Sequence, residues 1–172
     1  PLFRSSIPES FSIPFNAFDY FINLPQNSQN NANLQKSTSQ LDTLSENEIS
    51  KSTELLNFCS SIILNIELPE DDDYCKQLIS RLKQFGLNEK ELPEAFISIK
   101  RVWASKFNER AYISCRKIGI KLDQISMAVL CQKIIEAEYA FVIHTKNPSN
   151  NDKNEMYCEA VYGMGESLVG ES

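Results

Sequence analysis

A carboxylate flanked by glycines lies near the carboxyl end of the chain, in the run Gly163-Met-Gly165-Glu166 that continues as Ser167-Leu-Val-Gly170. Glycines allow backbone angles that a side chain forbids, and they let a ligand approach the chain closely. Mg²⁺ prefers oxygen ligands and usually binds through one or two carboxylates together with phosphate groups. The run therefore indicates a metal ligand at Glu166, with a tight turn followed by a solvated glutamate as the alternative.

Basic side chains recur on an expected helix that begins at Pro93. Lys100 shares one flank of this helix with Trp103 and Phe107, so its ammonium group is expected at the rim of a bulky apolar face. A lysine in such a place contacts phosphate as a point charge. The alternative for Lys100 is a cation that only water surrounds.

The cysteines and the histidine do not follow the pattern of a zinc site. The five cysteines are far apart in the sequence, no CxxC pair occurs, and the single histidine is His144. His144 lies in an apolar run with no neighbouring carboxylate or nucleophile, so we expect a structural role for it and assign no catalytic residue. The odd number and long spacings of the cysteines favour buried thiols in a reducing compartment such as the cytoplasm.

Composition excludes several classes of partner. The net charge of −6 argues against general attraction to nucleic acid or to an anionic membrane surface. No apolar run approaches the roughly 20 residues that span a bilayer. The sequence begins with Pro1, which we interpret as the start of an excised segment of a longer protein.

Three apolar runs near the carboxyl end predict strands, because turn residues bound each of them. The runs are Met127–Ile135, Tyr139–Ile143 and Met156–Tyr162. The short gaps between them favour antiparallel pairing in one small sheet. A fourth strand is expected at Ala111–Ile120, where Gly119 lies near the end.

The upstream half of the chain predicts helices, since apolar residues recur there at intervals of three or four. Asn16 is the expected cap of a short helix at Asn16–Leu24, after an extended segment at Pro1–Phe15. Ser45 and Glu48 fit a capping box, and prolines open two later helices. Those prolines are Pro69, whose helix ends near Gly86, and Pro93.

Residues 25–44 differ from these helices, because they are mostly Asn, Gln and Ser without apolar periodicity. Such a segment buries too little surface to offset its ordering entropy, so we expect a flexible insertion. The whole order predicts an α+β fold with helices packed on a small antiparallel sheet. The expected parts are residues 1–24, the insertion 25–44, a helical hairpin 45–92, and a helix with the sheet at 93–172.

Several of these motifs, in this order, resemble the nucleotide-binding domain of the dikinase family. The helix Ile99-Lys-Arg-Val-Trp-Ala-Ser-Lys-Phe-Asn-Glu-Arg-Ala111 resembles the signature helix of that domain. Similar counterparts are Val129-Leu-Cys-Gln-Lys-Ile-Ile135, Ala140-Phe-Val-Ile-His-Thr145, Asn147-Pro-Ser149 and the glycine run at 163–170. Within the family the likeness is greatest to the α-glucan water dikinases, and Ser12-Ile-Pro-Phe-Asn-Ala-Phe18 also resembles them, although Asn16 replaces their glycine.

The resemblance implies part of an ATP-grasp domain with ATP and Mg²⁺ as ligands. The family reaction converts ATP, water and a glucan into AMP, orthophosphate and phosphoglucan, through a phosphohistidine on a separate domain. Starch-like glucan would bind to other domains of the parent chain. The resemblance therefore also implies that this segment alone is inactive and binds ATP weakly or not at all.

Specific residues take roles from the resemblance. The segment Gln132, Lys133, Ile134 and Ile135 corresponds to the strand and hinge that meet the adenine, where an isoleucine covers the face of the base. Glu166 corresponds to the acid that serves ATP and Mg²⁺. Arg110 corresponds to a phosphate contact, with an ion pair to a neighbouring acid as the alternative, and Lys100 is a further phosphate candidate. Cations and Mg²⁺ ligands are the groups that phosphoryl transfer requires.

Two other functions are compatible with the sequence. The same domain occurs in phosphoglucan water dikinases and in phosphoenolpyruvate synthases or pyruvate phosphate dikinases, whose acceptors differ. A noncatalytic module whose helices bind a protein partner belongs to another class. A scaffold has no need of the Gly-Met-Gly-Glu turn, so that turn argues against the noncatalytic module.

Overall fold

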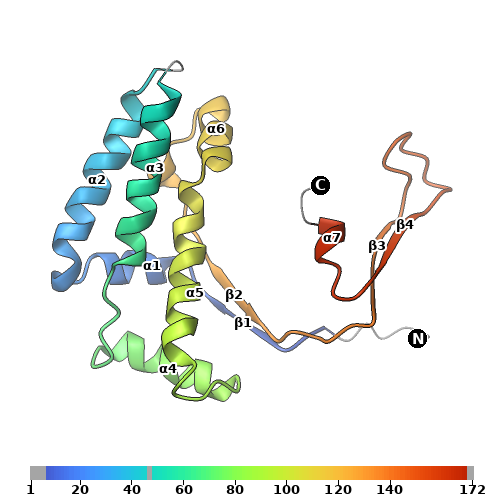
Figure 1. Cartoon of the computed structure of the whole chain (residues 1–172), viewed down its shortest axis with the longest axis horizontal. Coiled ribbons are helices and arrows are strands. Elements are labelled where there is room, and N and C mark those ends of the chain that lie inside the picture. Colours follow the sequence, from blue (N-terminus) through green and yellow to red (C-terminus); the bar gives the residue numbers. More distant parts are fainter. Residues whose placement is uncertain (1–6, 46–47, 170–172) are drawn as a thin grey trace. The chain divides into compact units, whose positions relative to one another are not determined.

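The computed structural model describes residues 7–45 and 48–169, and the contacts within it divide the chain into two compact units (Figure 1). We call Ser12–Cys131 the helical unit, and Pro1–Phe11 together with Gln132–Ser172 the hairpin unit. The division falls inside the segment 93–172 that the sequence predicted as one part. The helix with Trp103 therefore belongs with the helices that precede it.

The helical unit is built from helices that pack mainly on one another. Helix α3 lies between α2 and α5, and α6 contacts α3 as well (Figure 1). The α-helices are α1 (Asn16–Ile22), α2 (Ser28–Thr43), α3 (Ile49–Leu64), α4 (Asp73–Gln84), α5 (Leu92–Ala104) and α6 (Glu109–Ile118). Short 3₁₀ turns are η1 (Pro25–Asn27), η2 (Ser105–Phe107) and η3 (Leu122–Gln124).

Aromatic and aliphatic side chains from distant segments form the core of this unit. Phe21 of α1 is fully buried, and its ring lies 6.2 Å from that of Trp103 in α5 and 5.4 Å from that of Tyr74 in α4. Apolar spacing predicts one stripe from Leu55 to Ile66. Its members Leu56, Cys59, Ile62 and Ile63 are buried in α3, Leu55 is half-buried, and Ile66 is buried just beyond the end of the helix. Helical periodicity therefore identified the core side of α3 correctly.

The prediction of a flexible insertion at residues 25–44 is wrong, because most of this segment is helix α2. Leu34, Ser37 and Leu41 recur at intervals of three and four residues and are buried where α2 packs on α3. Asn27 anchors the start of α2: its amide nitrogen donates to the carbonyls of Phe21 and Glu67 at 2.8 and 2.9 Å. Tertiary contacts thus order a segment whose composition alone favours disorder.

The prediction of a strand at Ala111–Ile120 is also wrong, since α6 occupies these residues. Asn108 caps the helix by accepting a hydrogen bond from the Ala111 amide at 2.7 Å. Gly119 ends it in the left-handed region, with φ +73°. Tyr112 and Cys115 are buried at a helical spacing that the β-branched residues of this segment obscured.

The helix starts were predicted with mixed success. Pro93 lies in the first turn of α5, as expected. Glu48 accepts hydrogen bonds from the backbone and hydroxyl of Ser45, which confirms their contact, although α3 begins one residue after Glu48. Asp72 caps α4 in place of the start expected at Pro69, and Phe15 is the N-cap of α1 in place of Asn16.

Among the described residues the strands form two pairs, so the expected single sheet is wrong. Strand β2 (Val129–Gln132) pairs with β1 (Ser10–Ile13), which lies in the extended segment predicted near the amino end. Strand β3 (Tyr139–His144) pairs antiparallel with β4 (Tyr157–Tyr162). A partner for β2 from the distant amino end leaves no trace in the local pattern. The α+β class itself is confirmed.

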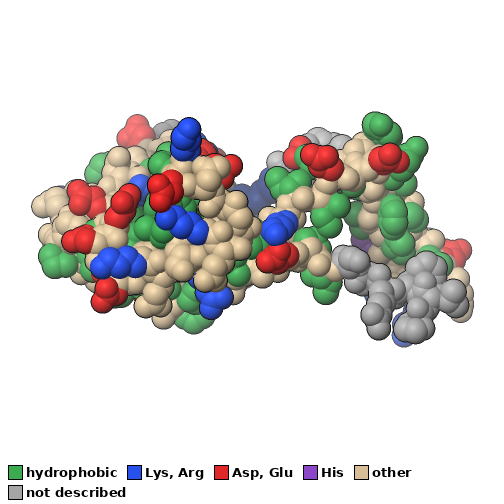
Figure 2. Space-filling model, turned by 90° about the horizontal axis from the view of Figure 1, so that it is seen from below, with side chains coloured by type: hydrophobic (Ala, Val, Ile, Leu, Met, Phe, Trp, Pro, Cys, Tyr) green, Lys and Arg blue, Asp and Glu red, His purple; other side chains and the backbone are tan. Residues whose placement is uncertain are grey.

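The hairpin unit contains β3, β4 and the short helix α7 (Glu166–Val169). Its residues 1–6 and 170–172 are outside the described part of the chain. In the register of the hairpin Tyr139 is opposite Tyr162, and His144 is opposite Tyr157. Figure 2 shows hydrophobic side chains at the surface of this unit, next to acidic ones. Across residues 7–45 and 48–169, no helix combines the length and apolar character that crossing a bilayer requires.

Candidate functional site

The glycine-flanked carboxylate lies in a turn at the open end of the hairpin. Gly163 follows β4 with φ +95°, and its amide donates to the carbonyl of Glu138 at 2.8 Å. Gly165 has φ +80°, and its carbonyl accepts from the amide of Leu168 at 3.0 Å. Glu166 is the first residue of α7, and its side chain is exposed. The turn thus presents a carboxylate that a cation can reach.

The predicted adenine segment forms the end of β2 and the residues after it. Gln132 is the last residue of β2. The Lys133 amide donates to the carbonyl of Glu9 at 3.0 Å, and its ammonium forms an ion pair with the Glu9 carboxylate. Ile134 and Ile135 are 81% and 54% exposed, so both are available to cover an apolar ligand. Sequence reasoning missed Glu9, whose partner is more than a hundred residues away in the chain.

Lys100 is less available than its position on the helix suggested. Its Nζ donates to the carbonyl of Ile66 at 3.2 Å, just beyond the end of α3. Burial lowers the pKa of Lys100, and Phe96 lies beside it at a shallow depression lined by the loop after α3. A phosphate at Lys100 would therefore compete with a backbone carbonyl for the ammonium group.

Arg110 lies in the first turn of α6 and is exposed. With Ser114 and Lys117 it lines an open depression along one side of that helix. Lys100 and Arg110 belong to different helices of the helical unit and line different depressions. Gln132–Ile135 and Glu166 belong to the hairpin unit. From the sequence we expect the strands near the carboxyl end and the helix with Trp103 to form one wall of an ATP cleft that Gln132 and Glu166 face, and this stays a prediction.

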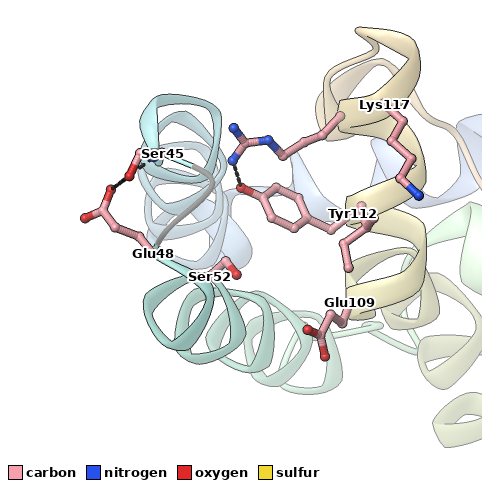
Figure 3. A pocket seen from close by; sticks show the side chains of 8 residues that line it. Ser45, Glu48, Ser52, Glu109, Tyr112 and Lys117 are labelled. Atoms are coloured by element: carbon pink, nitrogen blue, oxygen red, sulfur yellow. Dashed lines mark hydrogen bonds between the residues drawn. The ribbon is translucent and has the colours of Figure 1, made fainter.

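A cavity of about 400 Å³ lies between the start of α3 and α6, and sequence reasoning missed it (Figure 3). The hydroxyl of Tyr112 donates to the carbonyl of Leu41 and accepts from Arg116, both at 2.9 Å. On the opposite side, a hydrogen bond from the Ser45 backbone lowers the pKa of Glu48 to about 2. The lining carries two acids and two bases: Glu48 and Glu109, with Arg116 and Lys117. This balance of charge selects no ligand class.

A second lysine of the signature helix, Lys106, is more buried than Lys100. Its Nζ donates to the carbonyl of Ile125 at 3.1 Å and lies 5.5 and 5.1 Å from the ring centres of Phe18 and Phe107. Burial lowers the pKa of Lys106. The lysine therefore connects η2 to the segment that leads into β2, and the sequence alone did not separate it from the other cations of this helix.

The polar residues of the hairpin itself form a small cluster. Tyr157 donates to the Glu159 carboxylate at 2.7 Å, and this hydrogen bond raises the pKa of Tyr157. The ring of His144 lies 6.0 Å from that of Tyr157. In the described part of the chain no three His, Cys, Asp or Glu side chains converge on a metal position. The role of Glu166 as a metal ligand stays a prediction.

Comparison with known proteins assigns the chain to a class of nucleotide-binding domain. A family model described as "Pyruvate phosphate dikinase, AMP/ATP-binding domain" matches residues 81–172, which include α5, α6, the hairpin and the glycine turn. The chain belongs to this family.

Two plant enzymes align over almost the whole chain. The chain is 39% identical over 170 residues to "Alpha-glucan water dikinase, chloroplastic" of Solanum tuberosum, and 39% identical over 170 residues to "Alpha-glucan water dikinase 1, chloroplastic" of Arabidopsis thaliana. These alignments cover 95% of the chain but only 11% and 12% of the relatives. "Phosphoenolpyruvate synthase" of Pyrococcus furiosus is 34% identical over 71 residues, which cover 41% of the chain and 9% of that protein.

Proposed function

We propose that the chain is the ATP-binding part of an α-glucan water dikinase. The observation that carries this proposal is the extent of similarity. The plant glucan dikinases align over 95% of the chain at 39% identity, whereas phosphoenolpyruvate synthases of Pyrococcus species align over 41% to 63% of it at 34% and 27% identity. Similarity over the helical unit favours the glucan class, because the shared nucleotide-binding residues alone do not distinguish the two acceptors.

In the proposed reaction the β-phosphate of ATP passes to a histidine on another domain and then to a starch-like glucan. AMP and orthophosphate are released. In a plant this protein would act in the plastid, and elsewhere in the cytoplasm. Phosphoenolpyruvate synthase activity is the alternative within the same family, and the acceptor decides between them.

The residues of this chain would bind and orient the nucleotide. Ile134 and Ile135 are exposed and lie just after the end of β2, and we assign them to the adenine. Glu166 is an exposed carboxylate on a turn whose glycines let a ligand come close, and this fits a Mg²⁺ ligand. When bound, Mg²⁺ would neutralise charge on the phosphates. Arg110 is exposed and lines an open depression beside α6, and we assign it to a phosphate contact, with Lys100 as a further candidate.

The test is the variant Glu166→Gln in the full-length dikinase, with ATP labelled at the β-phosphate. We expect transfer of label to the enzyme's histidine to fall about a hundredfold, since one preorganised electrostatic contact of a transition state is worth that much. Glu155→Gln is the matched control, because Glu155 is another exposed acid of the hairpin unit. Unchanged transfer in Glu166→Gln would remove Glu166 from the mechanism, and label that reaches pyruvate rather than glucan would refute the glucan assignment.

A further inference from the structure

The glycine turn folds back against β3, so that its second glycine meets a specific residue of that strand. The Gly163 amide bonds to the Glu138 carbonyl, which directly precedes β3. From there the chain enters α7, which contacts β4 and lies beside the hairpin (Figure 1). At Gly165 an added Cβ would lie 2.6 Å from the Cβ of Ala140 and 3.8 Å from Cδ1 of Leu168. Non-bonded carbon atoms do not approach to 2.6 Å, so position 165 admits no side chain while Ala140 stays in place.

The two glycines of the turn therefore differ in what they require. Both have a positive φ, +95° at Gly163 and +80° at Gly165, which L-residues other than glycine adopt at a cost. A Cβ at Gly163 would meet nothing within 4 Å. Gly163 is thus needed for its backbone conformation alone, whereas Gly165 is needed for conformation and for close contact with Ala140.

The contact also decides on which face of the hairpin α7 lies. Ala140 is opposite Val161, and Val142 is opposite Glu159, so these four side chains share one face. Ala140, Val142 and Val161 are half-buried there, whereas Tyr139 and Phe141 on the other face are 66% and 61% exposed. The methyl group of Ala140 thus receives the turn on the sheltered face.

We propose that Ala140 is a positioning residue for Glu166: its small side chain lets Gly165 seat against β3 and thereby fixes where the Glu166 carboxylate stands. This inference rests on the proposed role of Glu166 toward ATP and Mg²⁺. A larger side chain at position 140 or 165 would clash with the residue opposite it, and the turn would have to move away from β3. Misplacement of a binding group by about 1 Å can lower a rate a hundredfold.

The first measurement is structural and requires no nucleotide. In the 172-residue chain, we expect a nuclear Overhauser effect between the Ala140 methyl and the Gly165 α-protons, and slow hydrogen exchange at the Gly163 amide. Gly165→Ala should accelerate that exchange more than the matched control Gly163→Ala, which has the conformational cost without the clash. The double variant Ala140→Gly/Gly165→Ala should return the exchange rate to about that of Gly163→Ala. Equal rates in both single variants, or no recovery in the double variant, would overturn the inference.

The second measurement follows β-phosphate transfer to the histidine in the full-length dikinase. We expect Gly165→Ala and Ala140→Val each to lower transfer about a hundredfold, with recovery of Gly165→Ala by Ala140→Gly to within about threefold of Gly163→Ala. Half-saturation by Mg²⁺ should rise in the clashing variants, which a general loss of folded protein would not cause. If Glu166→Gln transfers normally while the exchange pattern holds, the proposed function of Glu166 fails and with it the positioning role, although the contact itself stands.

Discussion

The helical unit buries its large apolar side chains, whereas the hairpin unit leaves several of them exposed to solvent. In the helical unit Phe21 and Trp103 are no more than 1% exposed. In the hairpin unit Phe141 and Tyr162 are 61% and 82% exposed. A hairpin of two strands is at best marginally stable alone, since each strand has one partner and little apolar surface is buried. The helices therefore supply most of the stability. The proposed adenine segment and Glu166 lie in the less stable hairpin unit, whereas Arg110 lies on a helix of the helical unit.

This difference follows from the number of elements that share each apolar surface. In the helical unit α3 packs on α2 on one side and on α5 on the other, so its apolar stripe is enclosed. In the hairpin, alternation places Tyr139, Phe141 and Ile143 on the face opposite Ala140, and among the described residues of the hairpin unit α7 packs on the Ala140 side. Binding sites are commonly drawn from such regions of low local stability.

The strongest test of the comparison removes the same side chain from each unit. Phe21→Ala should lower the free energy of unfolding by about 3–5 kcal/mol, because it leaves a cavity beside Trp103 and Tyr74. Phe141→Ala, the matched change in the hairpin, should cost less than about 1 kcal/mol, since that ring is largely in water. Urea unfolding followed by helical circular dichroism and Trp103 fluorescence measures both. Equal costs would contradict the contrast between the units.

Thiol reactivity sharpens the contrast next. Burial raises the pKa of Cys59 and of Cys75 to about 11, while Cys158 on the hairpin is exposed. A thiol with that pKa is about 0.1% thiolate at pH 8, and only the thiolate reacts. We expect iodoacetamide to modify Cys158 at least about a hundredfold faster than Cys59, as read by peptide mass spectrometry. Cys158→Ser should abolish the fast phase, and rapid modification of Cys59 would show that the helical unit opens readily.

The smallest expected effect concerns the polar anchor of α2. Asn27 is fully buried and exchanges hydrogen bonds with Glu67: its amide donates to the Glu67 carbonyl, and its oxygen accepts from the Glu67 amide at 2.7 Å. Asn27→Ala leaves these groups unsatisfied and should cost about 1–3 kcal/mol of stability. Asn30→Ala is the control, because its amide reaches the Asn65 carbonyl only at 3.5 Å. If both variants melt alike, α2 is held by its leucines alone.

Local signals predicted the elements that depend on local interactions. Helices α3, α4 and α5 were predicted from apolar spacing, and Pro93 marked the start of α5 correctly. Helix α6 was missed because β-branched residues outweighed its cap at Asn108 and its end at Gly119, although both signals were present. Helix α2 was missed for a different reason: two leucines and one serine form its whole buried side.

Some features of the candidate site were suggested by the sequence, and others were not. The residue types of the glycine run suggested a metal ligand at Glu166, because Mg²⁺ prefers carboxylate oxygens. The adenine role of Gln132–Ile135 came from the resemblance to the dikinase family, and both assignments stay predictions. The partner of Lys133 at Glu9, the bond from Lys106 to Ile125 and the cavity at Tyr112 and Arg116 carried no such signal. Each joins residues that are brought together only when the chain folds.

The amino-acid sequence by itself determined the family, the helices α3, α4 and α5, and the identity of the residues proposed to bind ATP. Those properties depend on residue type and on spacing within a few turns of chain. Only the tertiary structure decided that β2 pairs with the amino end, that the polar segment after Pro25 is a helix, and that Gly165 lies against Ala140. The physical reason is that these contacts join segments distant in sequence, and their energies arise from packing and hydrogen bonds that no local pattern encodes.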